Sequence, residues 1–158
     1  MELRPYQRDA KEAVFEQWEN GTRKTLLVLP TGCGKTIVFA KITEECVSHG
    51  DRVLILAHRG ELLEQAADKI AKATRLGCAT EKAEESCLGS WFRITVGSVQ
   101  SMMRTTRLSR FPEDYFDTII IDEAHMYKGA AGGEVALLLR RLMHKVGVGP
   151  ERVQFILT

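Results

Sequence analysis

The chain has 158 residues, 44% of them hydrophobic and 27% charged, a composition typical of one soluble globular domain with a buried core. No apolar run approaches the ~20 residues of a membrane-spanning helix, and the charged start MELRPYQRDA lacks the apolar stretch of a signal peptide, so we expect a cytoplasmic protein without a membrane partner. The net charge of +1 gives no overall basic field, and the four cysteines form no CxxC pair, which argues against a zinc site and for reduced thiols.

The hydrophobic pattern predicts strands that alternate with helices. Apolar residues three or four positions apart indicate helices, and short continuous aliphatic runs indicate buried strands. The predicted helices cover 5–18, with Asn20-Gly21 as the stop signal, the segment that carries Val38, Ile42 and Cys46, and residues 62–70 and 135–146. The predicted strands cover 24–30, 52–57, a short stretch within 76–82, and then 91–99, 117–122 and 153–158.

Strands that are apolar at every position are buried on both faces, which is the habit of parallel sheets. Right-handed connections between such strands place the helices on the sheet faces. The pattern therefore predicts a single α/β domain over 1–158, a doubly wound and mainly parallel sheet with helices on both faces.

The segment LPTGCGKT, residues 29–36, has the residue order of a phosphate-binding loop. Backbone amides of such loops cradle phosphates, a lysine neutralises charge, and a hydroxyl reaches Mg²⁺. Leu29 stands where the general pattern has its first glycine, but a strand precedes the loop and a helix follows it, as the pattern requires. An ordinary glycine turn does not explain a lysine and a threonine at the helix start. The candidate phosphate-binding residues are Thr31, Gly32, Cys33, Gly34, Lys35 and Thr36.

Two acidic residues, Asp122 and Glu123, stand at the carboxyl end of the strand TIII. Ligands of open α/β sheets bind outside that edge, where the glycine loop also lies. On their own, such acids are usually solvated turn residues. Beside a phosphate-binding loop, we expect Asp122 to hold Mg²⁺ and Glu123 to position and deprotonate the attacking water.

PTGCGKT together with DEAH resembles motifs I and II of superfamily 2 helicases and translocases, of the DEAD/DEAH-box and restriction-enzyme-motor type. LRPYQRDA (3–10) resembles the adenine-reading segment of that group, which implies that Gln7 meets the base edge and that Arg4 belongs to the cofactor-binding residues. AHRGELLEQ (57–65) resembles motif Ia and TVGSVQSM (95–102) motif Ib. These two motifs imply contacts to a nucleic-acid backbone by Arg59, Gly60, Ser98 and Gln100, and His125 would couple the two sites.

The resemblance implies a RecA-like P-loop lobe, the first motor lobe of an ATP-dependent helicase with ATP and Mg²⁺ as cofactors. Its catalytic residues would be Lys35, Asp122 and Glu123, with Thr36 and Asp122 as metal ligands. LRPYQ and HRGELLEQ are closer to DNA repair and restriction helicases than to RNA-processing ones, which favours DNA as the partner. The alternatives are a stand-alone nucleotide-binding switch, and a motor lobe of a restriction complex or an RNA helicase.

Two segments depart from the family pattern. The sequence ends at FILT, inside what resembles motif III, so we expect a second RecA-like lobe with its arginine finger to be a missing partner. Without that finger, worth ~10³ to 10⁵ in rate, we expect weak nucleotide binding and almost no turnover from this chain alone. Residues 126–142 are more similar to the segment after the DEAH box in Lhr-like helicases.

Overall fold

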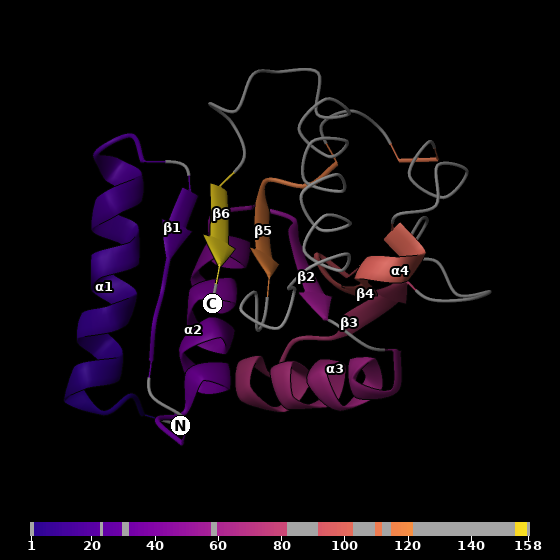
Figure 1. Cartoon of the computed structure of the whole chain (residues 1–158), viewed down its shortest axis with the longest axis horizontal. Coiled ribbons are helices and arrows are strands. Elements are labelled where there is room, and N and C mark those ends of the chain that lie inside the picture. The colour runs from indigo at the N-terminus through magenta and orange to yellow at the C-terminus, as the bar shows by residue number, and fades with distance from the viewer. Residues whose placement is uncertain are drawn as a thin grey trace, which may run out of the picture.

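The computed structural model describes residues 2–22, 24–29, 32–57, 60–81, 92–102, 110–111, 115–121 and 154–157 (Figure 1). The helices in this part of the chain are α1 (Pro5–Glu19), α2 (Lys35–Ser48), α3 (Gly60–Thr74) and α4 (Val99–Met102). Its strands are β1 (Lys24–Leu26), β2 (Val53–Ala57), β3 (Cys78–Glu81), β4 (Ile94–Ser98), β5 (Thr118–Ile121) and β6 (Gln154–Leu157).

The six strands form one sheet in the order β1-β6-β5-β2-β4-β3, and every neighbouring pair is parallel. The chain moves across the sheet in one direction from β1 through β2 to β3, and then returns through β4 and β5 to β6 (Figure 1). Because parallel connections are right-handed, a return in the opposite direction places the later connections on the other face. The predicted doubly wound parallel sheet is confirmed.

One face of the sheet carries the three long helices. Val14 and Trp18 of α1, several residues of α2, and Ile70 of α3 pack in one cluster with inward-facing residues of the central strands. The strand residues of this cluster are Val53, Ile55, Ile94, Val96 and Ile120. They alternate along each strand, as expected for one face of a pleated sheet.

The opposite face is buried as completely. Leu54, Leu56, Ile119 and Ile121 occupy the alternate positions of β2 and β5, and each is 0% exposed. Burial of such a side chain contributes about 1.5–3 kcal/mol. Both faces of the central strands are therefore covered, which explains the continuous apolar runs at 53–57 and 119–121.

The predicted elements agree with the observed ones in type and order, but several boundaries differ in the described ranges; the strand predicted over 91–99, for example, is observed over Ile94–Ser98. The first strand was expected over 24–30, whereas β1 ends at Leu26, which pairs with Leu157, the last residue of β6. The short helix α4 was not expected and follows β4 directly. The predicted helix over 135–146 and the end of the predicted strand at Asp122 lie outside the described residues. No helix within the described ranges combines the length and apolar composition that a membrane crossing requires.

Candidate functional site

The glycine loop after β1 has a backbone that only glycine adopts without strain. Gly32 has φ +84° and Gly34 has φ +72°, both in the left-handed region. A Cβ at Gly32 would meet no atom within 4 Å, so the loop surface is open at this point. A Cβ at Gly34 would lie 2.5 Å from Nε2 of Gln7. The first glycine provides an open surface, and the second allows α1 to approach the loop closely.

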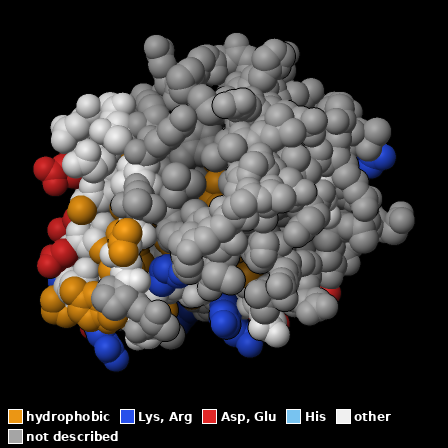
Figure 2. Space-filling view, in the orientation of Figure 1, with side chains coloured by type: hydrophobic (Ala, Val, Ile, Leu, Met, Phe, Trp, Pro, Cys, Tyr) orange, Lys and Arg blue, Asp and Glu red, His pale blue; other side chains and the backbone are white. Residues whose placement is uncertain are grey.

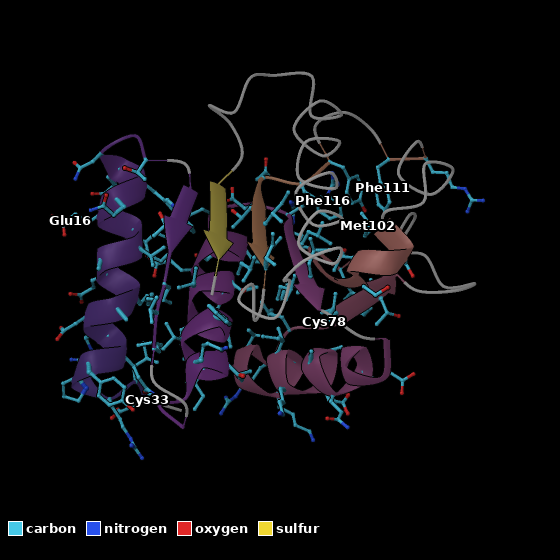
Figure 3. All side chains as sticks on the ribbon, viewed as in Figure 1. Glu16, Cys33, Cys78, Met102, Phe111 and Phe116 are labelled. Carbon is cyan, nitrogen blue, oxygen red and sulfur yellow. The ribbon has the colours of Figure 1, made fainter. Side chains whose placement is uncertain are left out.

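Helix α1 holds the loop through two hydrogen bonds to one carbonyl oxygen. Nε2 of Gln7 donates to O of Cys33 at 2.8 Å, and the Tyr6 hydroxyl donates to the same oxygen at 3.0 Å. Oε1 of Gln7 accepts a bond from the Arg4 amide at 2.9 Å. Figure 3 shows Cys33 beside the end of α1 at which the chain begins. Gln7 is only 4% exposed, so its carboxamide is buried between the helix start and the loop.

The loop leads directly into α2, whose first residues are the half-buried Lys35 and Thr36. The Gly34 carbonyl accepts bonds from the amides of Ile37 at 3.0 Å and Val38 at 3.2 Å, which starts the helical pattern. The N-terminus of a helix presents backbone amides and the positive end of the helix dipole, which suits an anion. Figure 2, in the same orientation, shows Lys and Arg side chains along the lower rim of the molecule. The loop is therefore suited to bind phosphate.

The sheet register brings the predicted acidic strand end to the same edge. Leu26 pairs with Leu157, and Leu157 pairs with Ile121, so the ends of β1 and β5 are level and two strands apart. Two strand spacings amount to about 10 Å. Asp122 and Glu123 follow Ile121 in the sequence, but they lie outside the described residues, as does His125. Their predicted roles stay predictions.

The predicted nucleic-acid contacts are described only in part. Ala57 pairs with Ser98, so the ends of β2 and β4, after which the two motifs continue, are adjacent. Ser98 is 4% exposed, and its Oγ accepts the Ser101 amide at 3.1 Å. This bond caps the first turn of α4, and the Ser98 hydroxyl keeps its proton for donation.

For the other candidate residues from the sequence, the structure gives only the element in which they lie, or they fall outside the described ranges. Gly60 is the first residue of α3, and Gln100 lies in α4. Arg59 and Thr31 lie outside the described residues. Arg4 is exposed and precedes α1. Among the described residues, the structure therefore brings together Arg4, Gln7, Gly32, Cys33, Gly34, Lys35 and Thr36, whereas Gly60, Ser98 and Gln100 lie at or after the ends of β2 and β4.

The described cysteines Cys33, Cys46 and Cys78 are free thiols. Burial raises the pKa of Cys46 to about 12 and that of Cys78 to about 11. Both therefore remain protonated at neutral pH and act as small apolar side chains. Cys33 contributes to the site through its backbone carbonyl.

Tyr6 was not predicted as a site residue. Arg4 and Gln7 on either side of it were candidate nucleotide-binding residues, whereas Tyr6 was included only within the helix predicted over 5–18. Its side chain is 40% exposed, and its hydroxyl reaches a residue 27 positions later. The position of Tyr6 beside Gln7 at the helix start was the only signal, and it does not reveal the partner of the hydroxyl.

Comparisons with known proteins agree with this geometry. The family model described as type III restriction enzyme, res subunit, matches residues 1–146. "Putative ATP-dependent helicase IRC3" of Saccharomyces cerevisiae is 33% identical over 131 residues, which are 78% of this chain and 19% of that protein. The type I restriction enzyme EcoAI endonuclease subunit of Escherichia coli is 28% identical over 139 residues, 84% of this chain and 17% of that protein. The chain thus spans about a fifth of the length of these relatives.

Among solved structures, the SWI2/SNF2 ATPase core of Sulfolobus solfataricus in complex with dsDNA superposes with a TM-score of 0.75 at 20% identity. The match covers 100% of this chain and 32% of that one. A likeness at this identity shows the fold, and it agrees with the predicted RecA-like lobe.

Proposed function

This chain belongs to the family of type III restriction enzyme res subunits, and we propose that it is the ATP-binding motor lobe of a helicase or translocase that acts on nucleic acid. The whole protein would couple ATP hydrolysis to movement along a strand, by closing this lobe against a second one. The observation that carries the proposal is the glycine loop. Its glycines Gly32 and Gly34 have positive φ and precede the N-terminus of α2, where Lys35 and Thr36 are the first residues.

The residues around the loop fit a magnesium nucleotide. The Lys35 ammonium would neutralise the β- and γ-phosphates, and the Thr36 hydroxyl would be one ligand of Mg²⁺. Asp122, which follows the strand end level with β1, would be the second protein ligand. When bound, Mg²⁺ neutralises phosphate charge. Glu123 would orient the attacking water and accept its proton.

We favour DNA as the nucleic acid. The segments 57–65 and 95–102 start from adjacent strands, because Ala57 pairs with Ser98. Contacts to a sugar-phosphate backbone come from hydroxyls, amides and basic side chains, and these two segments contain all three. Support for DNA over RNA comes from a fold neighbour whose structure is in complex with dsDNA and from a relative that is a restriction enzyme subunit.

Nucleotide binding is tested by titrating the protein with a fluorescent ATP analogue in Mg²⁺ buffer and comparing it with Lys35→Ala. We expect Lys35→Ala to weaken binding at least about 100-fold, because a charge-assisted phosphate contact is lost from a partly desolvated site. The matched control is Lys41→Ala, which removes the same charge from the same helix at a lysine outside the loop, where it pairs with Glu44 at 3.1 Å. Equal affinities for the wild type and Lys35→Ala would refute the loop as the phosphate site.

Nucleic-acid binding is tested by fluorescence anisotropy with single-stranded DNA and RNA of one sequence at increasing salt. We expect affinity to fall with salt, as backbone contacts require, and DNA to bind more tightly than RNA. Tighter RNA binding would overturn the preference for DNA. Nucleotide binding without affinity for either strand at low salt would favour a nucleotide-dependent switch instead of a motor.

A further inference from the structure

We propose that Tyr6, together with Gln7, is a positioning residue that fixes the peptide between Cys33 and Gly34. In this arrangement the Cys33 carbonyl faces α1 and the Gly34 amide faces the phosphates of the nucleotide. The inference rests on the proposed function in one respect only, which is that the glycine loop binds phosphate. The orientation of the peptide is itself a property of the nucleotide-free protein.

The geometry follows from the two bonds that converge on one oxygen. The Cys33 carbonyl accepts from the Tyr6 hydroxyl at 3.0 Å and from Nε2 of Gln7 at 2.8 Å, so donors from α1 use both of its lone pairs. A trans peptide is planar, and its N–H points opposite to its C=O. Because the carbonyl of this peptide faces α1, the Gly34 amide points away from α1.

The orientation of this peptide must be fixed by contacts outside the loop, because glycine by itself does not restrict the backbone to one conformation. A peptide flips when ψ of the preceding residue and φ of the following residue change together. Gly34 has φ +72° and tolerates either sign of φ at little cost. A flipped peptide would turn the Cys33 carbonyl toward the anion and remove one amide donor from the loop. Two donors on α1 make the flip costly before any nucleotide binds, which pre-organises the loop.

Gln7 is itself held in one orientation. Oε1 of Gln7 accepts from the Arg4 amide at 2.9 Å, and a backbone amide can pair only with the carbonyl end of the carboxamide. The NH₂ end must then point to the Cys33 carbonyl. The same arrangement explains why residue 34 is glycine, since a Cβ there would lie 2.5 Å from Nε2 of Gln7.

Tyr6 contributes the second donor from a more exposed position, because its side chain is 40% exposed. Loss of its hydroxyl therefore leaves no cavity in the core, and Tyr6→Phe removes one hydrogen bond with little other change. Sequence resemblance assigns Gln7 to adenine reading, whereas the observed bonds assign it to the loop backbone. The two roles predict different effects of a Gln7 substitution on the ratio of ATP affinity to GTP affinity.

The experiment measures dissociation constants of ATP, GTP and inorganic tripolyphosphate with Mg²⁺ for the wild type and Tyr6→Phe. We expect Tyr6→Phe to weaken all three ligands by the same factor, about 3- to 10-fold, which is the value of one net hydrogen bond. Gln7→Met, which keeps the volume but removes the donor, should weaken all three at least as much and leave the ratio of ATP to GTP unchanged. The matched control is Tyr115→Phe at the opposite edge of the sheet, which should change none of them.

Unchanged affinities in Tyr6→Phe, or a loss confined to ATP in Gln7→Met, would overturn the proposal, the latter in favour of adenine reading. A second measurement needs no nucleotide. The residual dipolar coupling of the Gly34 amide reports its orientation, and we expect it to change in the double variant Tyr6→Phe/Gln7→Met. An unchanged coupling would also overturn the proposal. A changed coupling in a protein that binds no nucleotide would refute the proposed function but not the positioning role.

Discussion

The polar groups at the carboxyl ends of the strands, here called the carboxyl edge, make different contacts from those at the amino ends, the amino edge. At the carboxyl edge, α1 turns its polar groups onto the backbone of the loop, and Lys35 and Thr36 stand at the start of α2. At the amino edge, polar groups bind one another. The Arg52 amide donates to Oδ2 of Asp117, and the Asp117 amide donates to the Arg52 carbonyl, both at 2.9 Å.

The amino edge is completed by contacts of the same kind. The Arg52 guanidinium lies 4.7 Å from the ring centroid of Tyr115, and Nη1 of Arg93 donates to the Gly50 carbonyl at 2.7 Å. These bonds join the starts of β2, β4 and β5 and close that end of the sheet. The difference is that the polar groups of α1 hold the glycine loop, whereas those at the amino ends of the strands join the starts of neighbouring strands.

The largest effect is expected from Gly34→Ala at the carboxyl edge. Alanine in the left-handed region costs about 1–2 kcal/mol, and its Cβ would also displace the Gln7 carboxamide. We expect nucleotide affinity to fall at least about 10-fold and the melting temperature to fall by about 2–8 °C. Both are measured on one purified variant, by ligand titration and by calorimetry.

The matched control for this change is Gly21→Ala. Gly21 has φ +90°, but no atom lies within 4 Å of its Cβ position, and it lies outside the loop. It should lose stability through the same backbone strain and keep full nucleotide affinity. A similar loss of affinity in both variants would mean that general destabilisation, and not the loop, explains the result.

A change at the amino edge should have the opposite profile. Asp117→Ala leaves the Arg52 amide without its side-chain acceptor, and we expect the free energy of unfolding to fall by about 1–2 kcal/mol. Chemical denaturation measures this loss, and Asp117→Asn, which retains an acceptor, should recover most of it. Nucleotide affinity should be unchanged. A drop in affinity would show that the two edges are coupled and that the contrast between them is incomplete.

A smaller loss is expected at the carboxyl end of β4. Ser98→Ala removes the cap of α4, since Oγ of Ser98 accepts the Ser101 amide, and should cost about 1 kcal/mol of unfolding free energy. Ser101→Ala, one turn later, keeps the capped amide and should cost less. If Ser98→Ala weakened single-stranded DNA binding by more than its stability loss explains, the predicted backbone contact of Ser98 would gain direct support.

The smallest effect concerns pH at the amino edge. Partial burial, with the nearby Asp117 charge, raises the pKa of Asp51 above its ordinary value of 3.8. A carboxyl with a raised pKa stabilises the fold only when protonated, so its contribution is present below pH 3.8 and is lost as pH rises through the raised value. Asp51→Asn should therefore gain slightly in melting temperature relative to wild type as pH rises from acid to neutral. Asp68→Asn on the exposed face of α3 is the charge-matched control, and an equal gain there would exclude the local cause.

Much of this arrangement could be predicted from the pattern of residues. The runs at 53–57 and 119–121 are apolar at every position, and only a sheet covered on both faces accommodates such strands. The order of glycine, lysine and threonine after a strand predicted the loop and the helix that follows it. The strand predicted over 24–30 is observed over Lys24–Leu26, because apolar composition does not show which residues of a run pair with a neighbouring strand.

The sequence by itself determined the kind of elements, the parallel sheet and the identity of the loop, because these depend on residue type and short-range spacing. Only the tertiary structure decided that α1 supports the loop and that the ends of β1 and β5 are level. Gln7 and Cys33 are 26 positions apart, and their bond depends on how α1 packs against α2. No local pattern encodes that distance, since it is set by the packing of the shared core.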